Sequence, residues 1–394
     1  MKQNVIIAFG GVSPEHEVSV LTAIQALSAL EESEYNLIPL YITKSGRWLT
    51  GDYLTTLDHY QDMDRLKEEG IPCTFSHNEQ GQPVLRELSG GWFSRPASYP
   101  IHAALPAFHG SDGENGGFQG MCEFYNIPFT GSSVLASSVS MHKIKAKELC
   151  RAHDLPVVDD IDFREPKWEQ DKDSIIEEAK SMGYPLIVKP VSLGSSIGVQ
   201  RAQNKDELID AVEEAFRYDD HLMVEATVDP LMEINCSVLG DHDDARPSAC
   251  ERPKGKEELL SFEDKYQSDG GDGKGMASAD RVIPADISDE LTRQIQQLSL
   301  RIFALCEASG VARLDFLVNA ETKKVYFNEI NTIPGSFSYY LWEESDVSFR
   351  ELLLEMIEIA RQRHRRKNGR LRSYETNLLS EKAVKGLKGL KQDK

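Results

Sequence analysis

Short apolar runs alternate with helical segments along the first part of the chain. Asn4–Phe9 is an apolar run that ends in a glycine pair, and Asn36–Ile42 is a second such run. Between them, apolar residues recur at the spacing of an amphipathic helix, at Val18, Leu21, Ile24 and Leu27. Ser13 and Pro14 predict the N-cap and the first position of this helix. The strand–helix–strand order predicts a parallel α/β sheet, which a buried strand at Ile101–Ala107 would extend.

Strand and helix patterns continue in two further groups after residue 131. The first group has a helical segment at residues 132–150 and apolar strands near Val157–Phe163, Leu186–Pro190 and Leu222–Glu225. The second group has a strand at Glu233–Leu239, a helix at Ser288–Ser309 and a last helix near Ser348–Arg363. Residues 45–98 show one helix near 60–69 and otherwise no clear pattern. We therefore expect three α/β domains, at residues 1–131, 132–225 and 226–366, and a tail at 367–394.

A polar hairpin at Val311–Gly335 is the most informative segment of the second group. Its two strands alternate with period two, so side chains two residues apart share a face. The residues expected on the polar face are Arg313, Asp315 and Leu317 of the first strand and Phe327, Glu329 and Asn331 of the second. A turn centred on Thr322 places Asp315 opposite Glu329. The same register places Arg313 opposite Asn331.

Two carboxylates, an amide and a guanidinium would then lie in one patch. Hard oxygen ligands without histidine or cysteine suit Mg²⁺, which keeps water and substrate phosphates as its other ligands. The alternative interpretation is an exposed hairpin whose charged residues pair on its solvent-facing side. The surrounding sequence, beginning with the Thr332–Gly335 turn, helps to decide between the two.

Composition narrows the class of protein. The chain has 394 residues, 40% of them hydrophobic, and a net charge of −20. Residues 361–394 hold 12 Lys or Arg against 3 Asp or Glu, so this segment carries +9 and the other 360 residues carry −29. An acidic body argues against general nucleic-acid binding. The basic tail is consistent with contact to RNA or anionic lipid, with packing on the acidic body, or with a solvated end.

Apolar runs and cysteines bear on the cellular compartment. No apolar run reaches the ~20 residues of a membrane span, and the first residues hold too short a run for a signal peptide. Six dispersed cysteines form no CxxC pair, which favours free thiols over disulfides or zinc. We therefore expect a cytoplasmic protein without a membrane partner.

Several polar residues stand at strand ends or beside glycine-rich turns. Lys189 ends an apolar strand before the loop Ser192–Gly198, where it suits either a phosphate contact or an ordinary strand end. The loop lacks the Walker A spacing, although Ser195 offers a hydroxyl there. Glu15, near a helix start, suits either an ammonium group or the helix dipole. His109 follows the carboxyl end of a strand, where open α/β sheets bind ligands.

Taken in order, these segments resemble the D-alanine–D-alanine ligase family of the ATP-grasp superfamily. The resemblance runs from Val5 to about Arg363. Its most specific parts are GGVSPEHEVS (10–19), HGSDGENGGFQG (109–120), GSSVLASSVSMHK (131–143), IVKPVSLGSSIGV (187–199), SFEDKY (261–266) and the ARLDF and NEINTIPG stretches of the hairpin. It implies an ATP-grasp fold with an N-terminal Rossmann-like parallel-sheet domain, a small central α/β domain and a larger C-terminal α/β domain.

The resemblance also implies an activity. Members of the family join two D-alanines with ATP, through a D-alanyl phosphate, and so supply peptidoglycan synthesis. The reaction would need ATP and two Mg²⁺ ions, for which Mn²⁺ is a possible substitute. The partners would be small-molecule substrates without nucleic acid, and the family is commonly homodimeric.

Residue roles are implied where positions match the family's motifs. For ATP, the resemblance implies phosphate contacts from Lys143, Lys189 and Lys265, and adenine and ribose contacts from Glu225 and Glu233. For the metal, it implies the ligands Asp315, Glu329 and Asn331. For catalysis, it implies an oxyanion site at Arg313 and the Gly335 N–H, and a substrate-ammonium contact at Glu15 linked to Ser195 and Tyr266. His109 would lie near the first substrate.

Some positions depart from the family's pattern. His142 replaces the usual aspartate before the lysine, and Ala226 replaces a common lysine. Tyr340 stands where the family's serine helps to bind the carboxylate of the second substrate, and its hydroxyl lies further from the backbone. Either that carboxylate binds differently, through Ser336 or Ser338, or the second substrate is not D-alanine. The alternative is a related ligase that uses D-lactate, D-serine or another amino or hydroxy acid.

Overall fold

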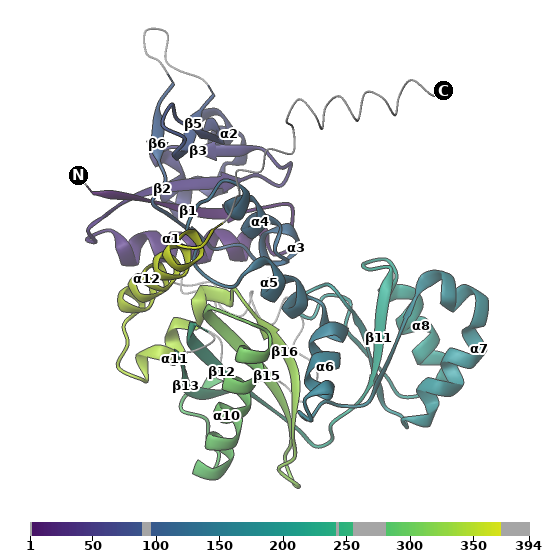
Figure 1. Ribbon diagram of the computed structural model, residues 1–394. Coiled ribbons are helices and arrows are strands. Elements are labelled where there is room, and N and C mark those ends of the chain that lie inside the picture. Colours follow the sequence, from purple (N-terminus) through teal and green to yellow (C-terminus); the bar gives the residue numbers. More distant parts are fainter. Residues whose placement is uncertain (1, 89–95, 242–243, 255–280, 372–394) are drawn as a thin grey trace, which may run out of the picture.

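The computed structural model describes residues 2–88, 96–241, 244–254 and 281–371. The described strands form three sheets that follow one another along the chain (Figure 1). Lys265, Tyr266 and most of the predicted tail lie outside the described residues. All six cysteines are free, as predicted, and all six are buried. No helix within the described ranges is long and apolar enough to span a membrane.

The first sheet has seven strands in the order β6-β5-β4-β3-β2-β1-β7. They are β1 (Gln3–Gly10), β2 (Tyr35–Ile42), β3 (Trp48–Thr50), β4 (Ile71–His77), β5 (Pro83–Glu87), β6 (Ser98–Pro100) and β7 (Ala103–Pro106). β1 pairs in parallel with β2 and β7, which confirms the predicted parallel core. Strands β3 to β6 extend the sheet by antiparallel pairing, in the region where the apolar pattern is weak.

The helices of this first part are α1 (His16–Leu30), α2 (Met63–Glu69), α3 (Ser111–Glu114) and α4 (Gly117–Phe124), with short 3-10 helices η1 (Asp52–Thr55) and η2 (Leu57–Gln61). α1 begins at His16, so the prediction of Ser13 as N-cap and Pro14 as first helical residue is wrong. The Ser13 hydroxyl instead donates to the His109 carbonyl at 2.8 Å and accepts from the Glu15 N–H at 3.1 Å. Ser13 therefore ties the loop after β1 to the loop after β7.

The second sheet has four antiparallel strands in the order β10-β9-β11-β8. They are β8 (Asp160–Arg164), β9 (Leu186–Pro190), β10 (Gln200–Ala202) and β11 (His221–Ala226). Helices α7 (Glu165–Ser181) and α8 (Lys205–Ala215) pack on it and share its apolar core (Figure 1). This small unit holds Lys189 and Glu225 on neighbouring strands.

The segment expected to be helical at residues 132–150 consists of two helices, α5 (Val134–Met141) and α6 (Lys143–Ala152). His142 separates them, with φ −91° and ψ 95°. Its ring nitrogen caps α6 by accepting a bond from the Lys145 N–H at 3.4 Å. The break places Lys143 at the first position of α6.

The third sheet has five antiparallel strands in the order β14-β13-β12-β15-β16. They are β12 (Leu231–Asp241), β13 (Asp244–Pro253), β14 (Arg281–Val282), β15 (Gly310–Asn319) and β16 (Val325–Asn331). Helix α10 (Asp289–Leu305) covers one face of this sheet. The chain continues through η4 (Gly335–Ser338), α11 (Tyr339–Glu343) and α12 (Phe349–Asn368). α12 lies beside α1, where Leu353 and Met356 join the core of the first sheet (Figure 1).

Candidate active site

The third sheet has one apolar and one polar face, because side chains alternate along each strand. On β15, Leu314 and Phe316 are buried in the core that includes α10. Arg313 and Asp315 alternate with them and therefore lie on the opposite face. Arg313 pairs with Asn331 of β16, which is the register predicted from the sequence.

A row of polar residues crosses four strands of this polar face. Asp315 of β15 pairs with Glu329 of β16, as predicted. On its other side, Asp315 pairs with Asn235 of β12, and Asn235 pairs with Glu251 of β13. Directly paired residues project from the same side of a sheet, so these four polar side chains lie side by side.

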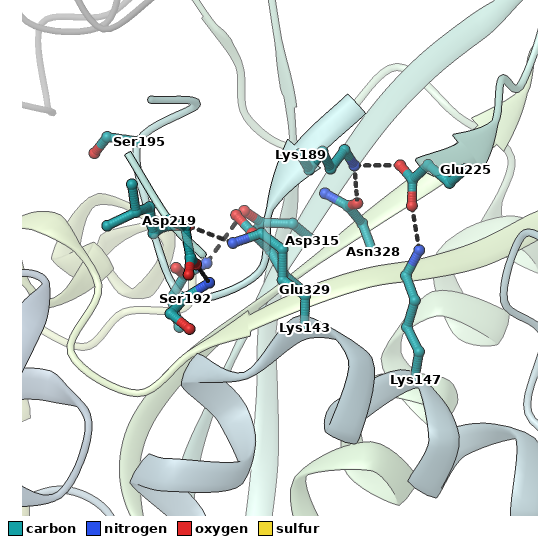
Figure 2. A network of polar contacts seen from close by, with 12 residues as sticks. Lys143, Lys147, Lys189, Ser192, Ser195, Asp219, Glu225, Asp315, Asn328 and Glu329 are labelled. Atoms are coloured by element: carbon teal, nitrogen blue, oxygen red, sulfur yellow. Dashed lines mark hydrogen bonds and ion pairs between the residues drawn. The ribbon is translucent and has the colours of Figure 1, made fainter. Parts of the chain in front are cut away.

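A β-bulge in β16 interrupts the pairing directly after Asp315. Asp315 and Phe316 are neighbours on β15, but their partners on β16 are two residues apart, which leaves Asn328 as an extra residue. Phe327 is consequently buried in the apolar core, so the prediction that it shares the polar face is wrong. Asn328 instead contacts the second sheet, where its side-chain oxygen accepts a bond from Lys189 Nζ at 3.1 Å (Figure 2).

The Arg313–Asp315 ion pair lies on the polar face. Arg313 Nε is 2.7 Å from Asp315 Oδ1, and Arg313 Nη2 is 2.7 Å from Asp315 Oδ2. Asn331 Nδ2 donates a further bond of 3.3 Å to Asp315 Oδ2. Burial opposes the charge on Arg313, but the Asp315 carboxylate outweighs it and raises the pKa of the guanidinium well above its usual value. Arg313 is therefore positively charged throughout the physiological pH range.

Oxygen donors suited to Mg²⁺ meet at this pair. Asp315 and Glu329 are paired carboxylates, and Asn331 contributes an amide oxygen two residues later. A carboxylate has about four lone-pair positions, so Asp315 retains acceptor capacity while Arg313 holds it. Within the described ranges, no group of three or more His, Cys, Asp and Glu side chains is arranged to hold a metal ion. A cation here would therefore take its remaining ligands from the amide, water and phosphate, which is a donor set that fits Mg²⁺.

Lys143 links α6 to the hairpin. Its Nζ lies 3.6 Å from Glu329 Oε2 and also donates to the carbonyl of Leu193 in the Gly-Ser loop (Figure 2). Lys189, on β9, reaches the same hairpin through Asn328. The structure thus brings two of the three predicted phosphate-binding lysines, Lys143 and Lys189, to β16, the strand that carries the predicted metal ligands Glu329 and Asn331.

A buried triad of charges adjoins Lys189. Glu225 of β11 accepts from Lys189 through one carboxylate oxygen and from Lys147 of α6 through the other (Figure 2). Burial disfavours the charged carboxylate, but Lys147 and then Lys189 overcome this and lower the pKa of Glu225 to about 2. Lys147 was not predicted as a site residue, although it lies four residues after Lys143 on the same helix face.

A second cluster surrounds Glu15 at the start of α1. Ser195, which has a left-handed conformation with φ 51°, donates its hydroxyl to Glu15. Glu114, which was not predicted as a site residue, accepts from the Gly110 N–H at 2.9 Å. Burial, reinforced by the Glu15 charge, raises the pKa of Glu114 to about 8, so this carboxyl is protonated at neutral pH. Its position in the glycine-rich motif after His109 is the signal that could have identified it.

His109 connects this cluster to the turn after Gly335. The His109 ring is hydrogen-bonded to Thr22 at 2.9 Å, and Thr22 accepts a bond from the Ser336 N–H at 3.1 Å. Burial and then the nearby Arg313 lower the pKa of His109 to about 3, so the ring is neutral. Gly335 begins η4 and is buried.

Three further residues named from the sequence are Glu233, Ser336 and Ser338. Glu233 lies on β12 opposite Leu317, so it shares the polar face of the sheet two residues away from Asn235. Ser336 and Ser338, the alternative carboxylate ligands, are both buried in η4 with positive φ angles of 51° and 50°.

Two family models together cover most of the chain. The model described as D-ala D-ala ligase N-terminus matches residues 4–132, and the model described as D-ala D-ala ligase C-terminus matches residues 149–358. The D-alanine–D-alanine ligase of Thermosipho africanus is 36% identical over 97% of this chain and 100% of its own length. The ligase of the same name from Bacillus velezensis is 34% identical over 91% of this chain and 98% of its own length.

Solved structures show the same similarity. The D-alanine-D-alanine ligase from Coxiella burnetii has a TM-score of 0.78 and 30% identity, covering 93% of this chain and 96% of its own. The VanG D-Ala:D-Ser ligase from Enterococcus faecalis has a TM-score of 0.76 and 26% identity, covering 91% of this chain and 100% of its own. The three sheets are those of an ATP-grasp ligase. More narrowly, the chain belongs to the D-alanine–D-alanine ligase family.

Proposed function

We propose that this chain uses ATP to join two D-alanine molecules into D-alanyl-D-alanine for peptidoglycan synthesis. The observation that carries the proposal is the convergence of Lys143 with Glu329, 3.6 Å apart, beside the partly buried Arg313–Asp315 pair. Joining a carboxylate to an amine in water is unfavourable, so the carboxylate must first be activated. Cations placed beside paired carboxylates are suited to activation of the substrate by phosphoryl transfer.

The first step would form D-alanyl phosphate. A carboxylate oxygen of the first D-alanine bonds to the γ-phosphorus of ATP, the bond to the bridging oxygen breaks, and ADP leaves. Lys143 and Lys189 would neutralise phosphate charge as the carboxylate approaches, together with Lys265. Asp315, Glu329 and Asn331 would hold Mg²⁺, which supplies further neutralisation of phosphate charge when bound. Glu225 and Glu233 would contact the adenine and ribose.

The first D-alanine would be held by its ammonium group at Glu15. The Ser195 hydroxyl donates to the Glu15 carboxylate and so orients it. Tyr266 would extend this chain of hydrogen bonds. Nearby, Glu114 is protonated and His109 is neutral at physiological pH. Neither adds a charge of its own there, so Glu15 remains the local anion that attracts an ammonium group.

The second step would form the peptide bond. The amine of the second D-alanine attacks the acyl carbon, and the carbonyl oxygen becomes an oxyanion. The Arg313 guanidinium and the Gly335 N–H would stabilise this oxyanion. Arg313 stays positively charged because its pKa is raised well above the usual value. The carbon–oxygen bond to phosphate then breaks, phosphate leaves with the electron pair, and the amine gives up its proton to phosphate or water.

A second candidate is a ligase that joins D-alanine to D-serine, D-lactate or a related acid. Tyr340 in place of serine favours it, as does similarity to a structure described as a D-Ala:D-Ser ligase. Phosphate release with D-alanine alone, compared with D-alanine plus each alternative acceptor, tests both candidates. We expect turnover on D-alanine alone and a dipeptide of two alanines by mass spectrometry. Turnover only on mixed pairs would replace the first candidate by the second.

We propose two metal ions, a homodimer and a cytoplasmic location on the strength of the family resemblance. We likewise propose domains at residues 1–131, 132–225 and 226–366, of which the last two form the ATP-grasp unit, and a tail at 367–394. Sedimentation with and without ATP and Mg²⁺ tests the assembly, and metal titration of the nucleotide-bound protein tests the number of ions.

A further inference from the structure

Tyr340 belongs to a buried cluster at one side of the polar face. Its hydroxyl donates to Glu251 Oε1 at 3.4 Å, and its ring is covered by the guanidinium of Arg281, whose central carbon lies 3.9 Å from the ring centroid. Arg281 Nη1 donates to Glu251 Oε2 at 2.8 Å. Asn235 Nδ2 completes the set with a bond of 3.0 Å to Glu251 Oε1. The Tyr340 side chain therefore contacts Glu251 through its hydroxyl and Arg281 through its ring.

This cluster lies next to the proposed site of peptide-bond formation. Glu251, Asn235 and Asp315 are paired across three neighbouring strands. Strands lie ~4.8 Å apart, so the backbones at Glu251 and Asp315 are ~10 Å apart, with Asn235 on the strand between them. Arg313, the proposed oxyanion ligand, is close enough to Tyr340 to influence its charge.

The charges of the cluster favour a carboxylate only at Arg281. Glu251 and Asp315 are carboxylates that would repel an incoming carboxylate. Arg313 donates Nε and Nη2 to Asp315 and is the proposed ligand of the oxyanion. Arg281 is the other guanidinium that contacts the surroundings of Tyr340 within the described part of the chain. A guanidinium carries five N–H donors in one plane, and that geometry matches a carboxylate.

We propose that Arg281 binds the carboxylate of the second substrate, and that Glu251 and Tyr340 are positioning residues that orient its guanidinium. This inference rests on the proposed ligase function. Glu251 fixes one edge of the guanidinium by an ion pair, and the Tyr340 ring supports its flat face. Tyr340, at the position of the family's serine, would therefore support the Arg281 guanidinium with its ring and would not bind the substrate carboxylate with its hydroxyl.

The experiment compares two acceptors that differ only in the carboxylate. D-alanine as first substrate is combined with either D-alanine or D-alaninamide as acceptor, and the dipeptide products are separated by mass spectrometry. The wild-type protein should prefer D-alanine. Arg281→Ala should lower kcat/KM for D-alanine by about 10- to 100-fold, because a charged hydrogen bond is lost, and should largely abolish the preference over D-alaninamide.

Matched variants separate binding from folding. Arg252→Ala removes an arginine of β13 that pairs with Asp286 at 3.0 Å. This variant should keep the wild-type preference for D-alanine over D-alaninamide. Arg281→Lys retains the charge without the planar fork, so it should raise the KM for D-alanine as acceptor more than it lowers kcat. Glu251→Gln should lower the preference in the same direction as Arg281→Lys, because the guanidinium loses its ionic support.

Hydroxylamine trapping distinguishes the failure of this inference from the failure of the proposed function. D-alanyl phosphate formed in the first step is captured as D-alanine hydroxamate without a second amino acid. No hydroxamate from the wild-type protein would overturn the proposed function. Hydroxamate from wild-type and Arg281→Lys proteins, with an unchanged preference for D-alanine over D-alaninamide in both Arg281 variants, would overturn the role of Arg281 alone.

Discussion

Glu225 on β11 and Lys147 on α6 form an ion pair whose side chains are 1% and 0% exposed. Lys189 contacts the second oxygen of the same carboxylate, so two buried cations share one anion. Buried charges are tolerated when they are paired, and their removal costs most when it leaves a charge without a partner. The Lys147–Glu225–Lys189 triad therefore couples the stability of the second sheet to the position of a proposed nucleotide-binding lysine.

Removing the anion should destabilise the protein more than removing one cation. Glu225→Gln leaves two buried ammonium groups without a counter-charge, so we expect a loss of about 3–5 kcal/mol in the free energy of unfolding. Lys147→Met leaves Lys189 paired with Glu225, and the expected loss is about 1–3 kcal/mol. Urea denaturation at neutral pH measures both values.

Lys145 provides the matched control for these variants. It lies on the same helix, is exposed, and pairs with Glu148 at 2.6 Å. Lys145→Met should change the free energy of unfolding by less than about 1 kcal/mol. Equal losses for Glu225→Gln and Lys147→Met would show that charge balance does not govern the triad.

Acid should weaken the wild-type protein through the same triad. The pKa of Glu225 is about 2 in the folded protein, below its ordinary value of 4.5. Stability from this group is therefore present above pH 4.5 and is lost as the pH falls through about 2, on the order of 3 kcal/mol in total. The Tm of Glu225→Gln should fall less than that of the wild type between about pH 5 and pH 2.5 in thermal unfolding scans. Parallel Tm curves would contradict this assignment.

The strand register of the polar hairpin was predictable from the sequence, but the bulge in β16 and the contact of Arg281 with Tyr340 were not. A short turn determines the register of two antiparallel strands, so alternation was sufficient to place Asp315 opposite Glu329. Alternation does not reveal a bulge, so the orientations of Asn328 and Phe327 appear only in the structure. Arg281 reaches Tyr340 through strand pairing between segments far apart in the chain, for which a single sequence carries no local signal.

The bulge residue Asn328 should affect nucleotide binding. Its side-chain oxygen accepts a bond from Lys189 Nζ at 3.1 Å, and Lys189 also pairs with Glu225. Asn328→Ala therefore removes one of these two contacts and leaves Lys189 less well positioned. We expect the KM for ATP to rise by about 2- to 10-fold, the equivalent of one hydrogen bond, with a smaller change in kcat. Coupled ADP-release kinetics measure both constants.

Lys324→Ala, at an exposed position on the same hairpin, is the control for Asn328→Ala. Lys324 lies in the turn just before β16, four residues before the bulge residue. Its loss should leave the KM for ATP within about twofold of the wild-type value. An equal rise in both variants would indicate a general disturbance of the hairpin and not a role for the bulge.

Glu114 should make the protein less stable as the pH rises, the opposite of the Glu225 effect. Burial and then the Glu15 charge raise its pKa from 4.5 to about 8 in the folded protein. Between these two values the unfolded chain releases a proton that the folded chain retains, so stability is lost as the pH rises from 4.5 through about 8. Glu114→Gln cannot ionise, so its Tm relative to the wild type should increase from about pH 5 to about pH 9, measured without nucleotide or metal. The expected gain at the higher pH is on the order of a few kcal/mol. Glu123→Gln controls for the loss of one carboxylate, at a partly exposed position on α4 where Glu123 pairs with Lys367 at 3.0 Å. A constant Tm difference between Glu114→Gln and the wild type would show that Glu114 is ionised in the folded protein.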